Sequence, residues 1–201
     1  NKVLARKYMD CNGRHWEIEA LAIDTGGHFT HHVYMWARRR ERTFAIKGVG
    51  GPFQPPFGPK KAQDITLGGR TIVGGVLLHL VGTHYIKSAF QAALKATLDS
   101  SAVDGEMKPG AVRLPKWIDA GYVRQLTAET LIRKESAGSV REIWHRQPGR
   151  ANEALDVRIY AEAAAHALGV FQLTPSQWET LAHNRGHAAG GLQEDLFAHR
   201  L

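Results

Sequence analysis

The chain is poor in cysteine and contains no long uninterrupted hydrophobic run. Its 201 residues include one cysteine, Cys11, which excludes an internal disulfide and a zinc site built from several cysteines. No stretch of about 18 uncharged apolar residues occurs, and residues 1–7 lack a signal-peptide core. These absences predict a protein without a membrane partner, and a reducing cytoplasm is the compartment that fits them.

Several catalytic motifs are also missing. The glycine-rich residues 48–51 are not followed by the Lys-Ser/Thr pair of a Walker loop, so ATP hydrolysis is not expected within this chain. No G-x-S-x-G elbow occurs, and Cys11 lies too near the start to be a good nucleophile candidate. Eleven histidines make zinc a competing idea, but there is no H-E-x-x-H motif, and the adjacent His31 and His32 cannot face one ligand on a helix.

Positive charge is in excess. Lysine and arginine outnumber aspartate and glutamate by 26 to 19, giving a net charge of +7, and such a balance favours polyanionic partners, with DNA first among them. The residues that we predict to contact duplex DNA are Arg38, Arg39, Arg40, Arg42, Lys60 and Lys61. A further basic group includes Arg141, Arg146, Arg150 and Arg158. Basic runs of this kind are also typical of an ordinary solvated face.

Period-two and period-3.6 hydrophobic patterns alternate along the chain, which predicts one mixed α/β domain over residues 1–201. Strands are expected over residues 17–23, 43–48, 76–81 and 111–114, with a hairpin at 65–73 and an antiparallel pair at 129–133 and 140–144. Helices are expected over residues 28–40, 85–98, 117–125 and, capped by Asn152 and ended by Gly169, over 152–168. Residues 49–61 are expected to form an irregular loop, 105–110 a polar turn, and 169–201 a helical tail entered through Pro175.

A few charged residues occupy positions suited to chemistry. Asp24 follows a predicted strand and precedes a glycine pair, where open α/β sheets place functional groups, although a turn aspartate is the alternative. Glu153 and Asp156 lie in the first turn of a predicted helix, where acids also simply complement the helix dipole. Lys47 ends a strand before Gly48 and would suit a cation that reaches a phosphate, although an exposed structural lysine is the alternative.

Carboxylates at a strand end and at the start of a later helix, in a basic α/β chain, suggest a divalent-metal site for phosphodiester cleavage. Mg²⁺ prefers oxygen ligands, and two ions about 3.5–4 Å apart can stabilise both the attacking and the leaving oxygen. The sequence therefore indicates a site for Mg²⁺ or Mn²⁺, with Asp24 and one of Glu153 and Asp156 as candidate ligands.

Five short blocks, in order, resemble the large terminase subunit of lambda-type tailed phages, in its carboxy-terminal nuclease domain. The blocks are residues 22–26, 45–48, 81–87, 125–129 and 152–161, and the resemblance covers roughly residues 15–168. It implies an RNase H-like fold, with a mixed sheet flanked by helices, that cuts concatemeric viral DNA with metal-bound acids. A separate ATPase domain upstream would drive packaging.

Carried over residue by residue, the resemblance implies that Asp24 is the strand-borne acid and Asp156 the helix-borne acid. Glu153 is a neighbouring candidate for the same role, and Lys47 would be a catalytic or phosphate-contacting cation. The family has another metal-binding aspartate in a block resembling Val-Asp-Thr-Gln, and no such block precedes Asp24 here. Because the chain also starts on Asn1, we expect a fragment that lacks a strand and one metal ligand, exposes apolar surface and cleaves poorly alone.

The expected function is thus a metal-dependent endodeoxyribonuclease of a packaging terminase, acting in the cytoplasm of the bacterial host. Double-stranded DNA is the expected substrate, and the terminase small subunit and capsid portal are partners expected of the parent protein. One alternative is a non-catalytic DNA-binding or packaging-motor interaction module on the same scaffold. Another is a related junction-resolving nuclease, which would prefer branched DNA.

Overall fold

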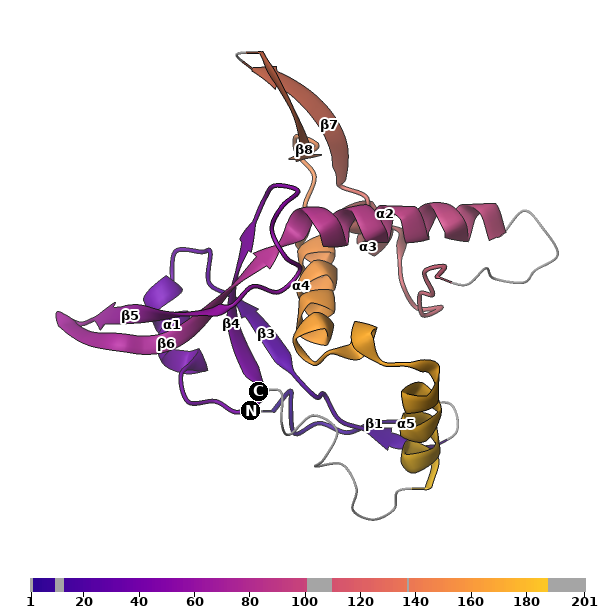
Figure 1. Cartoon of the computed structure of the whole chain (residues 1–201), viewed down its shortest axis with the longest axis horizontal. Coiled ribbons are helices and arrows are strands. Elements are labelled where there is room, and N and C mark those ends of the chain that lie inside the picture. The colour runs from indigo at the N-terminus through magenta and orange to yellow at the C-terminus, as the bar shows by residue number, and fades with distance from the viewer. Residues whose placement is uncertain (1, 10–12, 101–109, 137, 188–201) are drawn as a thin grey trace.

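A mixed four-stranded sheet forms the centre of the molecule, which is a computed structural model that describes residues 2–9, 13–100, 110–136 and 138–187. Its strands are β3 (Leu21–Asp24), β4 (Thr43–Val49), β6 (Arg70–Gly82) and β5 (Lys60–Leu67), in that spatial order. The first three are parallel, and β5 runs antiparallel to β6 (Figure 1). Within the described residues β3 is therefore an edge strand.

Helices cover both faces of this sheet. Helix α1 (Thr30–Ala37) packs on one face, where the apolar core contains Tyr34, Ala37, Ala45, Ile65, Val76 and Leu78. Helices α2 (Thr83–Ser100), α3 (Ala120–Leu126) and α4 (Glu153–Ala167) form the other core, with Ile46, Val81, Ile86, Phe90, Leu126, Leu155 and Ile159. We call these the α1 face and the α4 face of the sheet.

Strand register assigns further side chains to these faces, because paired residues in a sheet point the same way. Asp24 pairs with Ile46, Ile46 with His79, and His79 with Lys60, so all four lie in one row across the sheet. Since Ile46 belongs to the core on the α4 face, Asp24 points to that face as well. This row brings the end of β3 towards helix α4.

Outside the sheet, two antiparallel strands, β7 (Glu129–Ser136) and β8 (Ser139–Arg146), form a hairpin that projects from the body of the molecule (Figure 1). A second small pair, β1 (Tyr8–Met9) and β2 (His15–Trp16), lies near the start of the chain. The chain continues after α4 through the 3₁₀ helix η1 (Val170–Gln172) to α5 (Pro175–His187). No helix in the described part of the chain is long and apolar enough to cross a membrane.

The predicted α/β class and most of the predicted elements are confirmed. The strand expected at 17–23 is shorter and begins at Leu21, and the helix expected at 28–40 spans only 30–37. The hairpin and the buried strand expected at 65–73 and 76–81 share one long strand, β6. The strand expected at 111–114 is wrong, since that segment is irregular. Strands β1 and β2 had not been predicted. Cys11, most of the predicted turn at 105–110, and residues 188–201 lie outside the described residues.

Candidate active site

Asp24 is fixed in place by the residues that follow it. The buried Thr25 anchors the end of β3 to β4, because its backbone N–H and its side-chain hydroxyl both donate to the carbonyl of Ile46, at 2.9 and 2.8 Å. The carboxylate of Asp24 accepts a hydrogen bond of 3.1 Å from the N–H of Gly26, as in an Asx turn. The predicted turn role is thus real, and the side chain nevertheless stays exposed on the α4 face.

Asp156 lies in the first turn of α4 and is half-buried. Burial raises the pKa of its carboxyl group, and the negative charges of Glu129, Asp24 and Glu153 raise it further, while Lys87 acts in the opposite direction. The structure therefore brings Asp24 and Asp156, 132 positions apart by their numbering in the sequence, into one electrostatic group. The neighbouring carboxylates make the ionised form of Asp156 more costly, and a bound cation would relieve that cost.

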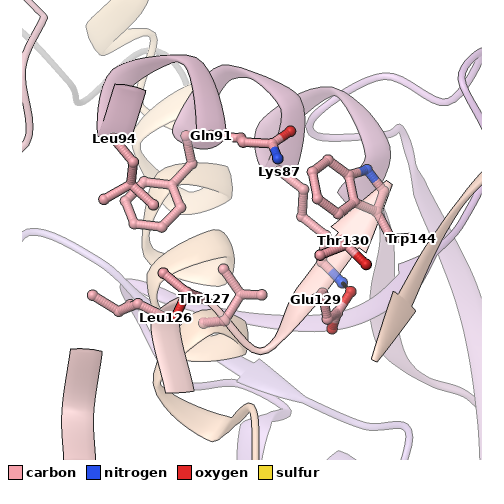
Figure 2. Close-up of a pocket in the computed structure, with 10 residues that line it drawn as sticks. Lys87, Gln91, Leu94, Leu126, Thr127, Glu129, Thr130 and Trp144 are labelled. Carbon is pink, nitrogen blue, oxygen red and sulfur yellow. Dashed lines mark hydrogen bonds and ion pairs between the residues drawn. The ribbon is translucent and has the colours of Figure 1, made fainter. Parts of the chain in front are cut away.

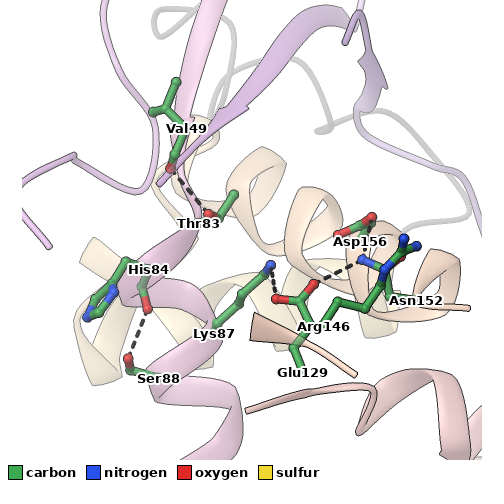
Figure 3. Close-up of polar contacts among 9 residues, drawn as sticks. All are labelled: Val49, Thr83, His84, Lys87, Ser88, Glu129, Arg146, Asn152 and Asp156. Carbon is green, nitrogen blue, oxygen red and sulfur yellow. Dashed lines mark hydrogen bonds and ion pairs between the residues drawn. The ribbon is translucent and has the colours of Figure 1, made fainter. Parts of the chain in front are cut away.

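A buried hydrogen-bond network supports Asp156 (Figure 3). Lys87 on α2 donates from Nζ to Oε2 of Glu129 at 2.6 Å, and the two side chains are only 10% and 6% exposed. The amide of Asn152 then donates to Oε1 of Glu129 at 2.9 Å and to Oδ2 of Asp156 at 3.1 Å. The capping role predicted for Asn152 is wrong for its side chain, which makes no hydrogen bond to the helix end and is used in this network instead.

Tyr160 lies beside the same acids, one helical turn after Asp156 on α4. Its hydroxyl hydrogen-bonds with the backbone of Gly48, and a Cβ added at Gly48 would lie only 2.7 Å from that oxygen. Burial raises the pKa of Tyr160, as do the charges of Asp24, Asp156 and Glu129, so the phenol stays protonated. The close approach explains why a glycine follows Lys47 at this point of β4.

An apolar cavity of about 160 Å³ lies beside this network, between α2 and the base of the β7–β8 hairpin (Figure 2). Phe90, Leu94, Leu126 and Leu155 line its inner wall. Lys87 and Glu129 also line this cavity, so their ion pair lies beside the apolar side chains of the other lining residues. Its surroundings therefore have a low dielectric, which strengthens the attraction within the pair.

Lys47 does not reach the acids. It pairs in register with Leu80, which packs into the core on the α1 face, so the side chain of Lys47 is exposed on the face of the sheet opposite Asp24. The cation that the structure places beside Asp156 is Lys87. Glu153 is close enough to Asp156 for its negative charge to raise the pKa of Asp156, but the side chain of Glu153 is exposed at the start of α4.

The predicted DNA contacts are distributed over both ends of the sheet. Residues 38–42 connect the end of α1 to the start of β4 and therefore lie at the end of the parallel strands away from Asp24. Three of these arginines make local contacts: Arg38 donates to the sulfur of Met35 at 3.7 Å, Arg40 lies 4.5 Å above the ring of Trp36, and Arg42 pairs with Glu17 at 3.7 Å. Lys60 shares the row and face of Asp24, whereas Lys61 pairs with Leu78 and faces the other way.

The acidic side chains gathered around Asp156 offer carboxylate oxygens, which are the ligands that a hard cation prefers. Among the described residues, however, no group of three or more His, Cys, Asp or Glu side chains is arranged as a finished metal site. The physical reason is visible in Glu129, whose two oxygens are already engaged by Lys87 and Asn152. Asp24, Asp156 and the exposed Glu153 are the other carboxylates of this group.

Fold and site define a three-layer α/β domain that gathers acids where β3 ends and α4 begins. The sequence profile described as "Terminase large subunit gpA, endonuclease domain" matches residues 1–178, and the chain belongs to this family. It is 30% identical over 164 residues to the large terminase subunit of Enterobacteria phage P21, a match that covers 79% of this chain and 24% of that protein. No solved structure matches the chain.

Two residues of the site, Lys87 and Glu129, were not predicted as functional. Both lie inside blocks that carry the family resemblance, at 81–87 and 125–129, and this is the signal that could have identified them. Their pairing could not be derived from sequence because 42 positions separate them.

Proposed function

We propose that this domain is a metal-dependent DNA endonuclease that cuts concatemeric phage DNA during genome packaging. The observation that carries the proposal is the convergence of Asp24 and Asp156 on one face of the sheet, in a chain that belongs to the terminase endonuclease family. The net charge of +7 is in keeping with a polyanionic substrate.

In this proposal Asp24 and Asp156 hold Mg²⁺ or Mn²⁺, with two ions in the complete domain. Such ions supply an activated water and neutralise charge on the reacting phosphate. Asp156 has to be ionised for this role, and its raised pKa means that a cation and a proton compete for the same carboxylate. Tyr160 remains a neutral hydroxyl beside the acids and supports α4 against Gly48.

Lys87 and Glu129 act in this proposal as positioning residues. Glu129, held by Lys87, orients the amide of Asn152, and that amide fixes one oxygen of Asp156. The other oxygen of Asp156 is thereby directed towards the ligand position. The carboxylate is therefore preorganised, which lowers the reorganisation required when the phosphate reacts.

The wider role follows from the family and is also part of the proposal. We infer an RNase H-like topology, which the three parallel strands with an antiparallel β5 support. The chain spans about a quarter of the P21 relative, so an ATPase domain elsewhere in the parent protein is proposed. We also propose that the parent protein contacts the terminase small subunit and the capsid portal, and that it acts in the host cytoplasm.

The test is cleavage of supercoiled plasmid with Mn²⁺ or Mg²⁺, by this chain and by the full-length protein that contains it. Asp24→Asn and Asp156→Asn are expected to abolish cutting while DNA binding persists. Glu153→Gln should retain most of the activity, and Glu41→Gln, an exposed acid beyond the end of α1, serves as the unrelated control. DNA binding by a full-length protein that never cuts would instead support the interaction-module alternative, and preferential cutting of branched DNA would support a junction-resolving nuclease.

A further inference from the structure

The projecting hairpin has two chemically different faces. On one face the cross-strand pairs are Glu129 with Arg146, Leu131 with Trp144, Arg133 with Glu142, and Glu135 with Val140. This face carries three acids and two arginines, and Arg133 forms an ion pair of 3.4 Å with Glu142. The other face contains the pairs Thr130 with His145, Ile132 with Ile143, and Lys134 with Arg141, and we call these six residues the cationic ribbon face. None of the six is an acid.

Lys134 and Arg141 lie directly opposite each other on this face, and both are exposed. Like charges in directly opposed positions destabilise a sheet, and a two-stranded ribbon has little other stabilisation to spare. Within the described residues neither side chain forms an ion pair. An anionic partner would remove this repulsion, so the arrangement is explained most directly by a polyanion that binds across both strands.

We propose that the cationic ribbon face binds the phosphate backbone of duplex DNA. This inference rests on the proposed nuclease function, which supplies DNA as the polyanion. Eight residues per strand give a ribbon about 26 Å long, and the major groove, about 12 Å wide, admits a two-stranded ribbon. The face carries cations, hydroxyl and imidazole groups, and such side chains are common donors to phosphate oxygens.

The base of the same hairpin is part of the candidate active site. Glu129 and Arg146 are its first cross-strand pair, and both contact Asn152, through Oε1 of Glu129 at 2.9 Å and Nη1 of Arg146 at 3.4 Å (Figure 3). Asn152 in turn contacts Asp156. The arm that binds DNA in this proposal is therefore joined at its base to the acid cluster through Asn152, although Glu129 and Arg146 belong to the other face of the ribbon.

The experiment measures DNA binding separately from cutting. A fluorescein-labelled 30-base-pair duplex is titrated with the chain in EDTA, and its anisotropy is followed between 50 and 200 mM salt. Lys134→Gln and Arg141→Gln are each expected to weaken binding several-fold and to lower the slope of log affinity against log salt by about 0.9, with about 1.8 for the double variant. Arg133→Gln is the matched control, since it removes one charge from the same strand but from the ion-paired face.

The outcomes separate this inference from the proposed function. Equal effects of Arg133→Gln and Lys134→Gln, or unchanged affinity in the double variant, would overturn it even if the plasmid assay shows cutting. A selective loss in Lys134→Gln and Arg141→Gln would support it even if no cutting is found. Thermal melts of all variants check folding, and because all three positions are exposed, each melting temperature should stay within a few degrees of the parent.

Discussion

Lys87→Met is expected to destabilise the domain strongly, because it removes the cation from a buried pair. The side chain of Glu129 is only 6% exposed, and without Lys87 its carboxylate would keep one partner, the amide of Asn152 at 2.9 Å. Removing one member of a buried pair costs about 3–5 kcal/mol, and the surviving hydrogen bond places the expected loss near the lower limit, about 3 kcal/mol. At about 2–4 °C per kcal/mol for a chain of this size, the melting temperature should fall by about 6–12 °C.

The assay is thermal and urea unfolding followed by circular dichroism, combined with a double-mutant cycle. Glu129→Gln alone should be similarly destabilised, while Lys87→Met/Glu129→Gln should be about 2–3 kcal/mol more stable than the two single losses predict. The exposed pair Arg133–Glu142, with side chains 78% and 45% exposed, is the comparison, and Arg133→Met should cost at most about 0.5 kcal/mol. A loss below about 1 kcal/mol for Lys87→Met, or strictly additive effects in the cycle, would refute the reasoning.

Two further predictions concern Asp156 and Gly48. Because burial and neighbouring carboxylates raise the pKa of Asp156, its contribution to stability is complete below the ordinary value of 3.8 and is lost as pH rises through the raised pKa. Asp156→Asn should therefore be more stable than the parent at pH 7 and equal to it near pH 3.8 in urea unfolding, and a gain that persists at the lower pH would contradict this. Gly48→Ala should cost about 1–3 kcal/mol, because its Cβ would lie 2.7 Å from the Tyr160 hydroxyl. Tyr160→Phe should recover part of that loss, whereas Gly50→Ala, with nothing within 4 Å, should be nearly neutral in thermal melts.

The sequence was most informative where local pattern and tertiary packing agree. Helix α4 has apolar residues at helical spacing and ends before Gly169, which adopts a positive φ of 71°, so both its existence and its end could be predicted. The β7–β8 hairpin was also predictable, although its full length was not. The segment 111–114 has a strand-like pattern but no partner strand among the described residues, and pattern alone cannot supply one.

The site was only partly predictable, for a related reason. Asp24 could be selected because it occupies a special local position at a strand end. Asp156 shares the first turn of its helix with Glu153, and the family resemblance singled it out. The functions of Lys87 and Asn152 depend on long-range contacts with Glu129, and no local pattern encodes such contacts. Asn152 also shows how tertiary contacts override a local preference, because its amide makes two hydrogen bonds in the network and none to the helix end.

Chain topology, rather than local charge density, determines which basic residues can serve the acids. A helix between two parallel strands must run back along the sheet, so the basic residues 38–42 that follow α1 necessarily return to the amino ends of the strands. An antiparallel neighbour has the opposite consequence: β5 begins beside the carboxyl end of β6, which places Lys60 in the row of Asp24, three strand spacings or about 14 Å away. The cationic ribbon face lies outside this sheet. The base of its hairpin is hydrogen-bonded to Asn152, and Lys134 and Arg141 lie farther along the two strands. For the proposed cleavage, Lys60 and the cationic ribbon face are therefore better placed to hold DNA than residues 38–42, the densest basic run in the sequence.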